Sequence, residues 1–357
     1  MTQSLTKTNR WYALFMLAAL GLTAFASTNA AWADPLKVCV SSTDAGSIIQ
    51  AVGGDAVSLT GFVKGTDDPH VVEPTRRMIE SLASADLLVI VGNGLEEAWL
   101  PAMLAQAGRS ELNSGGRRHL DLSANLRTVA GPEGRGVPGS FHPEDNPHFL
   151  VDAVEGVKAA AAVADKLSEI APGQATQFEQ RYRAFAKAVM AEMLGEAIAS
   201  KHPAEKFEEL AIAIERGELD KHFSAQGGAG AALGGQLGAF EPFRDTPVVG
   251  DHDLWPYFAR RYGVRVLGYL EPEPGVPPTA PHLQGVIAEM KARDARVILT
   301  VPYFDPRHAR FVEQATGGLI VAMANNPGSL PGTDSYLDMI RYNAEALRQA
   351  LEQARGH

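Results

Sequence analysis

Short apolar segments alternate with helix-like segments along most of this chain, and this alternation restricts the fold more than any other feature. Residues 86–91 (DLLVIV) are continuously apolar after the first aspartate, as in a strand that is buried on both faces. Other strands are expected at 36–41 and 56–63, and helices at 45–52, 75–84 and 96–106. Such alternation predicts a parallel sheet with helices on both faces, so the first half should be an α/β domain.

The same alternation returns in the second half of the chain. Strands are expected at residues 247–250, 265–270, 297–301 and 319–323, separated by helices. A chain of 357 residues is also longer than one hydrophobic core normally organises. We therefore expect two similar α/β domains, at residues 34–171 and 201–357.

The segment between these domains, residues 172–200, begins with a proline and keeps apolar residues at helical spacing. This pattern predicts a long rigid helix that links the two domains. Residues 107–147 are rich in Gly, Pro, Arg and Asn and are expected to form a loop. The Gly/Ala-rich run at 226–238 lacks the arrangement of a phosphate-binding loop.

The first 33 residues have the pattern of a cleavable secretory signal. Lys7 and Arg10 precede a mostly apolar stretch at 11–26, and Ala31-Trp32-Ala33 fits a small-residue cleavage site. The apolar stretch is short for a membrane span, and no cysteine follows it closely enough to carry a lipid anchor. We expect export to the periplasm with cleavage after Ala33.

The composition argues against some partners. The chain has 32 basic and 42 acidic residues, a formal net charge of −10, and the expected leader contributes basic residues only. An acidic protein is a poor nucleic-acid binder and is suited to handling cations. Its one cysteine, Cys39, allows no internal disulfide.

Three histidines occupy similar local positions. His70 follows an expected strand in a loop stiffened by Pro69 and Pro74, His252 follows a short strand, and His148 stands at the start of a helix. Strand ends present ligand-binding groups in open α/β folds. If the domains face each other, three neutral imidazoles could converge on a zinc ion. Taken alone, His70 could also be a general base or an ordinary surface histidine.

Longer motifs surround these histidines. In chain order they are DDPHVVEPT, SADLLVIVGNGLEEAWL, NPHFLVD, HDLWPYFARRYGVRVLG and DSYLDMIRYNAEAL. With these motifs, the sequence resembles the cluster A-I solute-binding proteins of metal ABC importers, the periplasmic binders of zinc and manganese. The resemblance implies two α/β domains joined by one long helix, with the metal in the cleft between them. It also implies that His70, His148 and His252 are three of the metal ligands.

The sequence departs from this family pattern at the fourth ligand. The family often has an aspartate after the last strand of the second domain, whereas residues 321–328 (VAMANNPG) contain no acid. Water is the first choice for this position, and Glu73, Asp253 and Glu271 are nearby carboxylates that could take it. Three imidazoles without an obvious acid favour zinc over manganese as the bound ion.

Some zinc-binding members carry a histidine-rich loop that collects metal. Residues 107–147 contain only His119 and His142. We expect His119 to be solvated, and His142 could be an auxiliary metal contact or a solvated loop residue.

The resemblance implies a monomer, not an enzyme, that captures zinc in the periplasm and delivers it to the membrane permease of an ABC importer. Manganese import, a periplasmic zinc chaperone and a metal-dependent adhesin are alternatives with the same fold. A zinc hydrolase is a further alternative, because three histidines with an open fourth position also describe a catalytic zinc site. The sequence contains no His-Glu-x-x-His or Gly-x-Ser-x-Gly motif to support it.

Overall fold

The computed structural model describes residues 34–125, 146–219, 221, 233–273 and 276–356. The expected signal segment, its cleavage site and His142 lie outside these residues. The described residues from Leu36 onward belong to one compact unit. Within the described part of the chain, no helix is both long enough and apolar enough to cross a bilayer.

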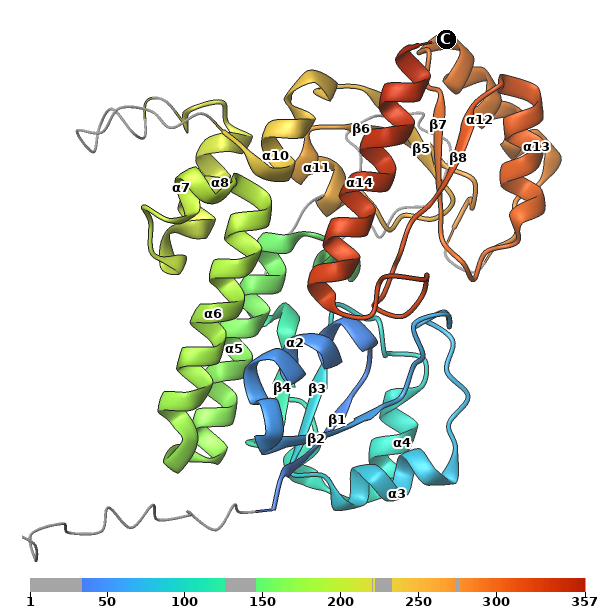
Figure 1. The fold of residues 1–357 in the computed structure, drawn as a ribbon. Coiled ribbons are helices and arrows are strands. Elements are labelled where there is room, and N and C mark those ends of the chain that lie inside the picture. Colours follow the sequence, from blue (N-terminus) through green and yellow to red (C-terminus); the bar gives the residue numbers. More distant parts are fainter. Residues whose placement is uncertain (1–33, 126–145, 220, 222–232, 274–275, 357) are drawn as a thin grey trace, which may run out of the picture. The chain divides into compact units, whose positions relative to one another are not determined.

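The first sheet consists of four parallel strands in the order β2-β1-β3-β4 (Figure 1). Their bounds are β1 Leu36–Val40, β2 Val57–Gly61, β3 Leu87–Ile90 and β4 His119–Asp121. Neighbouring residues of a strand face different cores. Val38 and Val40 pack with helices α2 (Thr43–Gly53) and α5 (Ala153–Ile170), whereas Cys39 packs with α3 (Arg76–Ser84) and α4 (Leu100–Ala107). Burial on both faces accounts for the continuous apolar run in β3.

The second sheet repeats this arrangement, with four parallel strands in the order β6-β5-β7-β8. The bounds are β5 Pro247–Gly250, β6 Arg265–Tyr269, β7 Val297–Thr300 and β8 Leu319–Ala322. One face packs on α12 (Ala280–Ala292) and α13 (Pro306–Thr316), and the other on α11 (Pro256–Tyr262) and α14 (Tyr336–Arg355). The predicted fold class, two parallel α/β sheets flanked by helices, is confirmed.

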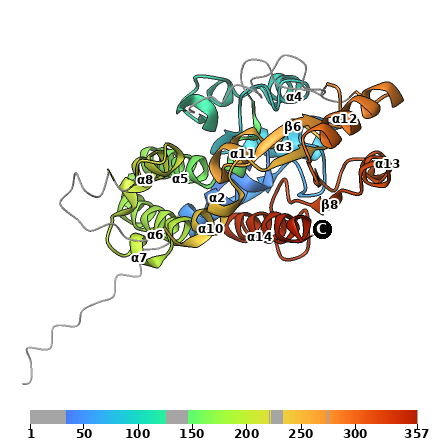
Figure 2. The ribbon, with the colours of Figure 1, turned by 90° about the horizontal axis from the view of Figure 1, so that it is seen from above.

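The remaining helices connect the two sheets. Helix α6 (Ala175–Leu194) lies beside α5 in both ribbon views (Figures 1 and 2) and also packs on α2 and on α10 (Gly235–Phe240). Two other helices are α7 Glu196–Ala199 and α8 Phe207–Glu215. Single 3₁₀ turns cover Gly54–Ala56, Ser110–Leu112, Leu122–Asn125, His148–Val151, Pro172–Gln174, Ala204–Lys206 and Glu241–Phe243.

The single helix expected over residues 172–200 is interrupted, so that part of the prediction is wrong. Helix α6 ends at Leu194, and Gly195 adopts φ 82° and ψ 155°, outside helical geometry. A Cβ atom at Gly195 would lie 2.9 Å from the backbone nitrogen of Gly235. The positive φ and the close backbone approach both require glycine here.

Two predicted boundaries in the first domain also differ from the structure. The stretch at 107–147, expected to be a loop, contains strand β4, which pairs with β3. Three residues are too few to show an alternating pattern, so this strand left no clear signal. The helix expected from residue 96 begins at Leu100, because residues 93–99 form turns.

A buried ion pair joins the start of helix α5 to helix α11, which follows strand β5. Arg261 of α11 donates from Nε and a terminal nitrogen to the two carboxylate oxygens of Asp152, at 2.8 and 2.9 Å. The Asp152 and Arg261 side chains are 0% and 3% exposed. Asp152 also caps the start of α5 by accepting from the backbone nitrogen of Val154. Removing Asp152 would leave the buried Arg261 guanidinium with only a longer contact of 3.9 Å to Glu215, so most of its compensation would be lost.

Asp152→Ala is therefore expected to lower the free energy of unfolding by about 3–5 kcal/mol, measured by urea denaturation. The control is Glu80→Ala, which breaks the exposed Arg76–Glu80 pair and should change stability by about 0.5 kcal/mol or less. If Asp152→Ala costs no more than this control, the buried pair is not a major contributor to stability.

Candidate metal centre

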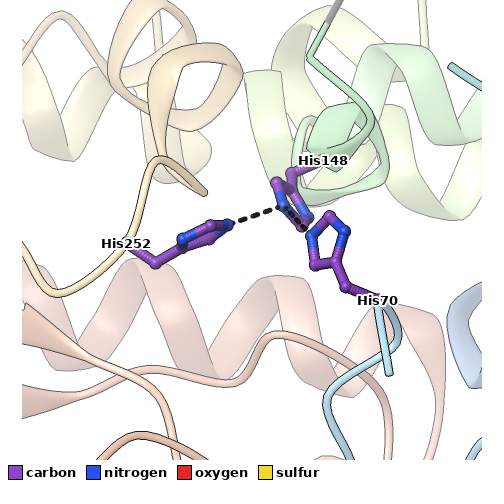
Figure 3. Close-up of side chains that lie close together, drawn as sticks. All are labelled: His70, His148 and His252. Carbon is purple, nitrogen blue, oxygen red and sulfur yellow. Dashed lines mark hydrogen bonds between the residues drawn. The ribbon is translucent and has the colours of Figure 1, made fainter. Parts of the chain in front are cut away.

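Three imidazoles from distant parts of the sequence point toward one another (Figure 3). The Nε2 atom of His148 lies 3.1 Å from Nε2 of His70 and 3.2 Å from Nε2 of His252. The possible ligand atoms of the three residues all lie within 4.8 Å of one another. Nitrogens bound at about 2.0–2.1 Å to a tetrahedral zinc ion are roughly 3.3 Å apart. The separations therefore suit three ligands around one zinc ion.

His70 is held by the loop between β2 and α3. Its backbone nitrogen donates to the Asp68 carboxylate at 2.9 Å. The preceding carbonyl, of Pro69, accepts a hydrogen bond from the indole nitrogen of Trp99 at 3.2 Å. Trp99 is itself buried in the core beneath the first sheet. The position of His70 thus depends on a core tryptophan and on a local turn.

His148 begins the 3₁₀ turn His148–Val151 that leads into α5. Its backbone nitrogen donates to the side-chain oxygen of Asn146 at 2.8 Å. Asp152 ends the turn and caps the following helix. Hydrogen bonds at both ends therefore fix the turn that carries the imidazole.

His252 follows β5 and is 1% exposed. Its Nδ1 atom is hydrogen-bonded to the carboxylate of Glu271, and the ring of Phe304 stacks on it at a centroid separation of 5.5 Å. A carboxylate that accepts the Nδ1 proton leaves the Nε2 lone pair available to a metal ion. Glu271, a candidate for the fourth ligand position, therefore contacts the ring nitrogen that does not face the cluster.

The other two candidate carboxylates are not part of the histidine cluster either. Glu73 is exposed, and Asp253 is buried with its backbone carbonyl bonded to Asn146. Among the residues that the structure describes, the group of possible metal-ligating atoms contains only the three histidines.

A small polar cavity borders His148. Its volume is about 20 Å³, and its lining includes Ser42, Tyr303 and Asn325. Asn325 is 5% exposed, and neither polar atom of its side chain has a hydrogen-bond partner among the residues that the structure describes; the same holds for the buried Tyr303 hydroxyl. A cavity of this size with several polar partners can hold one water molecule.

Burial makes two of the site histidines, His70 and His252, poor bases. Burial lowers the pKa of His70 to about 4, with a smaller contribution from neighbouring His252. Burial also lowers the pKa of His252 to about 4. Both imidazoles are therefore uncharged at neutral pH, which is the form that binds metals.

The other described histidines have different surroundings. His119, expected to be solvated, is instead partly buried in β4, and its Nδ1 lies 2.8 Å from the carbonyl of Leu112. His282 in α12 contacts the carbonyl of Tyr269 at 3.0 Å through Nε2. Neither belongs to the histidine cluster.

Comparisons of the sequence with a family model and with known proteins point to the same kind of protein. The family model described as zinc-uptake complex component A periplasmic (ZnuA) matches residues 38–201 and 238–350. The metal ABC transporter substrate-binding lipoprotein ScbA of Streptococcus cristatus is 21% identical over 353 residues, which are 96% of this chain and 99% of that protein. The high-affinity zinc uptake system protein ZnuA of Brucella suis biovar 1 is 23% identical over 207 residues, which are 58% of this chain but only 50% of that protein.

Solved structures agree on the fold. A crystal structure of ZnuA superimposes with a TM-score of 0.64 at 18% sequence identity, covering 89% of this chain and 99% of that one. At this identity the likeness concerns the fold alone, whereas the family model extends over more than half of the sequence. The chain belongs to the family of zinc-uptake complex component A periplasmic proteins.

Proposed function

We propose that this protein captures zinc at His70, His148 and His252 in the periplasm and delivers it to the membrane permease of an ABC importer. The observation that carries the proposal is the separation of 3.1 and 3.2 Å between Nε2 atoms, which suits a tetrahedral zinc ion. Membership of a family of zinc-uptake components supports the transport role. We also propose that the protein acts as a monomer after cleavage of residues 1–33.

Capture is favoured by the state of His70 and His252, because the lowered pKa of each ring keeps it uncharged. Uncharged imidazoles offer their lone pairs without first losing a proton. The Glu271 carboxylate keeps the His252 proton on Nδ1, so Nε2 faces the incoming ion. Three neutral ligands leave the charge of the ion uncompensated, and the nearby carboxylates of Asp68 and Glu271 supply the negative potential, since both act electrostatically on His70.

Water is our proposed fourth ligand. The cavity of about 20 Å³ beside His148 has room for one molecule. Asn325 and Tyr303 line it with polar atoms that have no protein partner. A water molecule there would satisfy these groups and lie beside His148, the one histidine of the cluster that lines this cavity.

Zinc is favoured over manganese because the cluster offers nitrogen ligands and no carboxylate. A zinc chaperone or adhesin would use the same site, and the partner distinguishes these functions from import. Hydrolysis is a weaker candidate. The carboxylate that contacts the cluster, Glu271, is bonded to Nδ1 of His252, the ring nitrogen that faces away from the proposed zinc ion, so it is not placed to act as a general base. The family is one of substrate-binding proteins rather than enzymes.

The ligand assignment is tested by His70→Ala, His148→Ala and His252→Ala. Each should weaken zinc binding strongly, because each removes one of three protein ligands, and isothermal titration calorimetry measures the change. His282→Ala is the control and should bind as the wild type does, since the His282 ring contacts the Tyr269 carbonyl and lies outside the histidine cluster. Wild-type affinity in one of the three variants would remove that histidine from the site.

The choice of metal is tested by direct competition. Zinc should displace manganese from the protein, because nitrogen-rich sites follow the usual divalent order and manganese prefers oxygen. Equal or reversed affinities would show that carboxylates complete the site.

The pH dependence follows from the lowered pKa of His70 and His252. An exposed imidazole would bind zinc progressively more weakly below about pH 6.5. Proton competition at a pKa of about 4 should instead leave the contributions of His70 and His252 to zinc binding nearly constant down to about pH 5. Zinc at a thousandfold excess over its dissociation constant should stabilise the protein by about 4 kcal/mol, and this stabilisation should fade as the pH approaches 4. Thermal melts of apo and zinc-loaded protein between about pH 4 and 8 provide the measurement.

The apo protein should show the related effect on its own stability. Between about pH 4 and 6.5 the unfolded chain binds protons that folded His70 and His252 do not bind. Apo stability is therefore expected to fall as the pH is lowered through this window. If the zinc-induced rise in melting temperature instead disappeared around pH 6.5, that result would contradict the buried, neutral state of the two rings.

A further inference from the structure

One buried side chain contacts the segments that carry two of the three histidines. Asn146 is 1% exposed. Its side-chain oxygen accepts from the backbone nitrogen of His148 at 2.8 Å. Its side-chain nitrogen donates to the backbone carbonyl of Asp253, the residue after His252, also at 2.8 Å. A single planar amide therefore bridges the backbones of both histidine segments.

The same two segments are joined again on the other side of His148. Asp152, which ends the 3₁₀ turn, forms the buried pair with Arg261 of α11. Helix α11 begins shortly after His252 and packs directly on the 3₁₀ turn. The His148 turn is thus bonded to the segment after His252 at both of its ends, through Asn146 before the turn and Asp152 after it.

We propose that Asn146 is a positioning residue that sets the separation of His148 and His252, and thereby the size of the ion that the site prefers. This inference rests on the proposed zinc-binding function. The Nε2 atoms of the two rings are 3.2 Å apart, close to the roughly 3.3 Å of a tetrahedral zinc site. A larger divalent ion needs its ligands further apart, and that would stretch a buried hydrogen bond that water cannot replace.

The bridge depends on the chemistry of an amide. Only a group with an acceptor and a donor on one rigid plane can serve the His148 nitrogen and the Asp253 carbonyl together. Serine can still accept from the nitrogen two residues later, although more weakly, but it is too short to reach the carbonyl. Aspartate keeps the shape and the acceptor but has no donor when ionised.

The test compares Asn146→Ser with the wild type by calorimetric titration of zinc and of cadmium, a larger divalent ion. Outer-shell changes of this kind commonly cost about tenfold or more in metal affinity, so the variant should bind zinc about tenfold more weakly. Cadmium affinity should fall less, which raises the cadmium-to-zinc preference. A merely structural loss would weaken both ions alike and leave this ratio unchanged.

Asn93→Gly is the matched control. The Asn93 side chain makes a long 3.5 Å contact to the Asn146 carbonyl, and its φ of 50° is one that glycine adopts readily. This variant removes a neighbouring amide without touching the bridge, so both affinities and their ratio should match the wild type.

Asn146→Asp is the second variant in case the serine variant folds poorly. Its added charge acts on both divalent ions, so the cadmium-to-zinc ratio still reports the geometry, and it should rise. An unchanged ratio in folded Asn146 variants overturns the inference, whether or not the apo melting temperature falls. Failure of the proposed function looks different: the wild type would not bind zinc, or His148→Ala would bind it normally.

Discussion

Burial of the central strands β1, β3, β5 and β7 on both faces is the constraint on which the rest of the structure depends. In both sheets, neighbouring residues of a strand enter different hydrophobic cores. One of these cores is shared, because Val40 of the first sheet and Val248 of the second belong to the same packed cluster, together with Met190 of α6. A close-packed core has low compressibility, so the elements that share it keep fixed positions relative to one another. The loops that carry the three histidines are therefore anchored on a rigid core, and the three side chains come together between these loops.

The site combines two requirements that normally oppose each other. Bringing three imidazoles within about 3 Å would be costly if they carried charge, and burial keeps His70 and His252 neutral. Burial of polar rings is costly in turn unless their hydrogen bonds are made. Glu271 satisfies Nδ1 of His252, while Asp68 and Asn146 fix the backbones of the other two residues. Polar neighbours thus hold the imidazoles in place, and the carboxylates would balance the charge of the proposed zinc ion.

The fold was readable from the sequence because it rests on local patterns. Apolar strands such as residues 86–91, separated by helices, predict a parallel sheet. Of the eight strands in the described residues, seven were expected in this way, and the short β4 is the exception. The end of α6 was not readable, because the apolar spacing continues past Gly195 and the close approach to Gly235 is a tertiary contact. The three histidines were found through long motifs, whereas the roles of Glu271 and Asn146 depend on contacts 19 and 107 residues apart in the chain. No local pattern carries such information.

The single cysteine, Cys39, is held in an environment that makes its thiol unreactive. Cys39 lies in the core between the first sheet and helices α3 and α4, and burial raises the pKa of its thiol to about 12. Zinc and oxidants both react with the thiolate, which is almost absent at such a pKa. The Cys39 thiol therefore does not compete with the imidazoles for a metal ion in the folded chain, and it is not available for oxidative cross-linking between two copies.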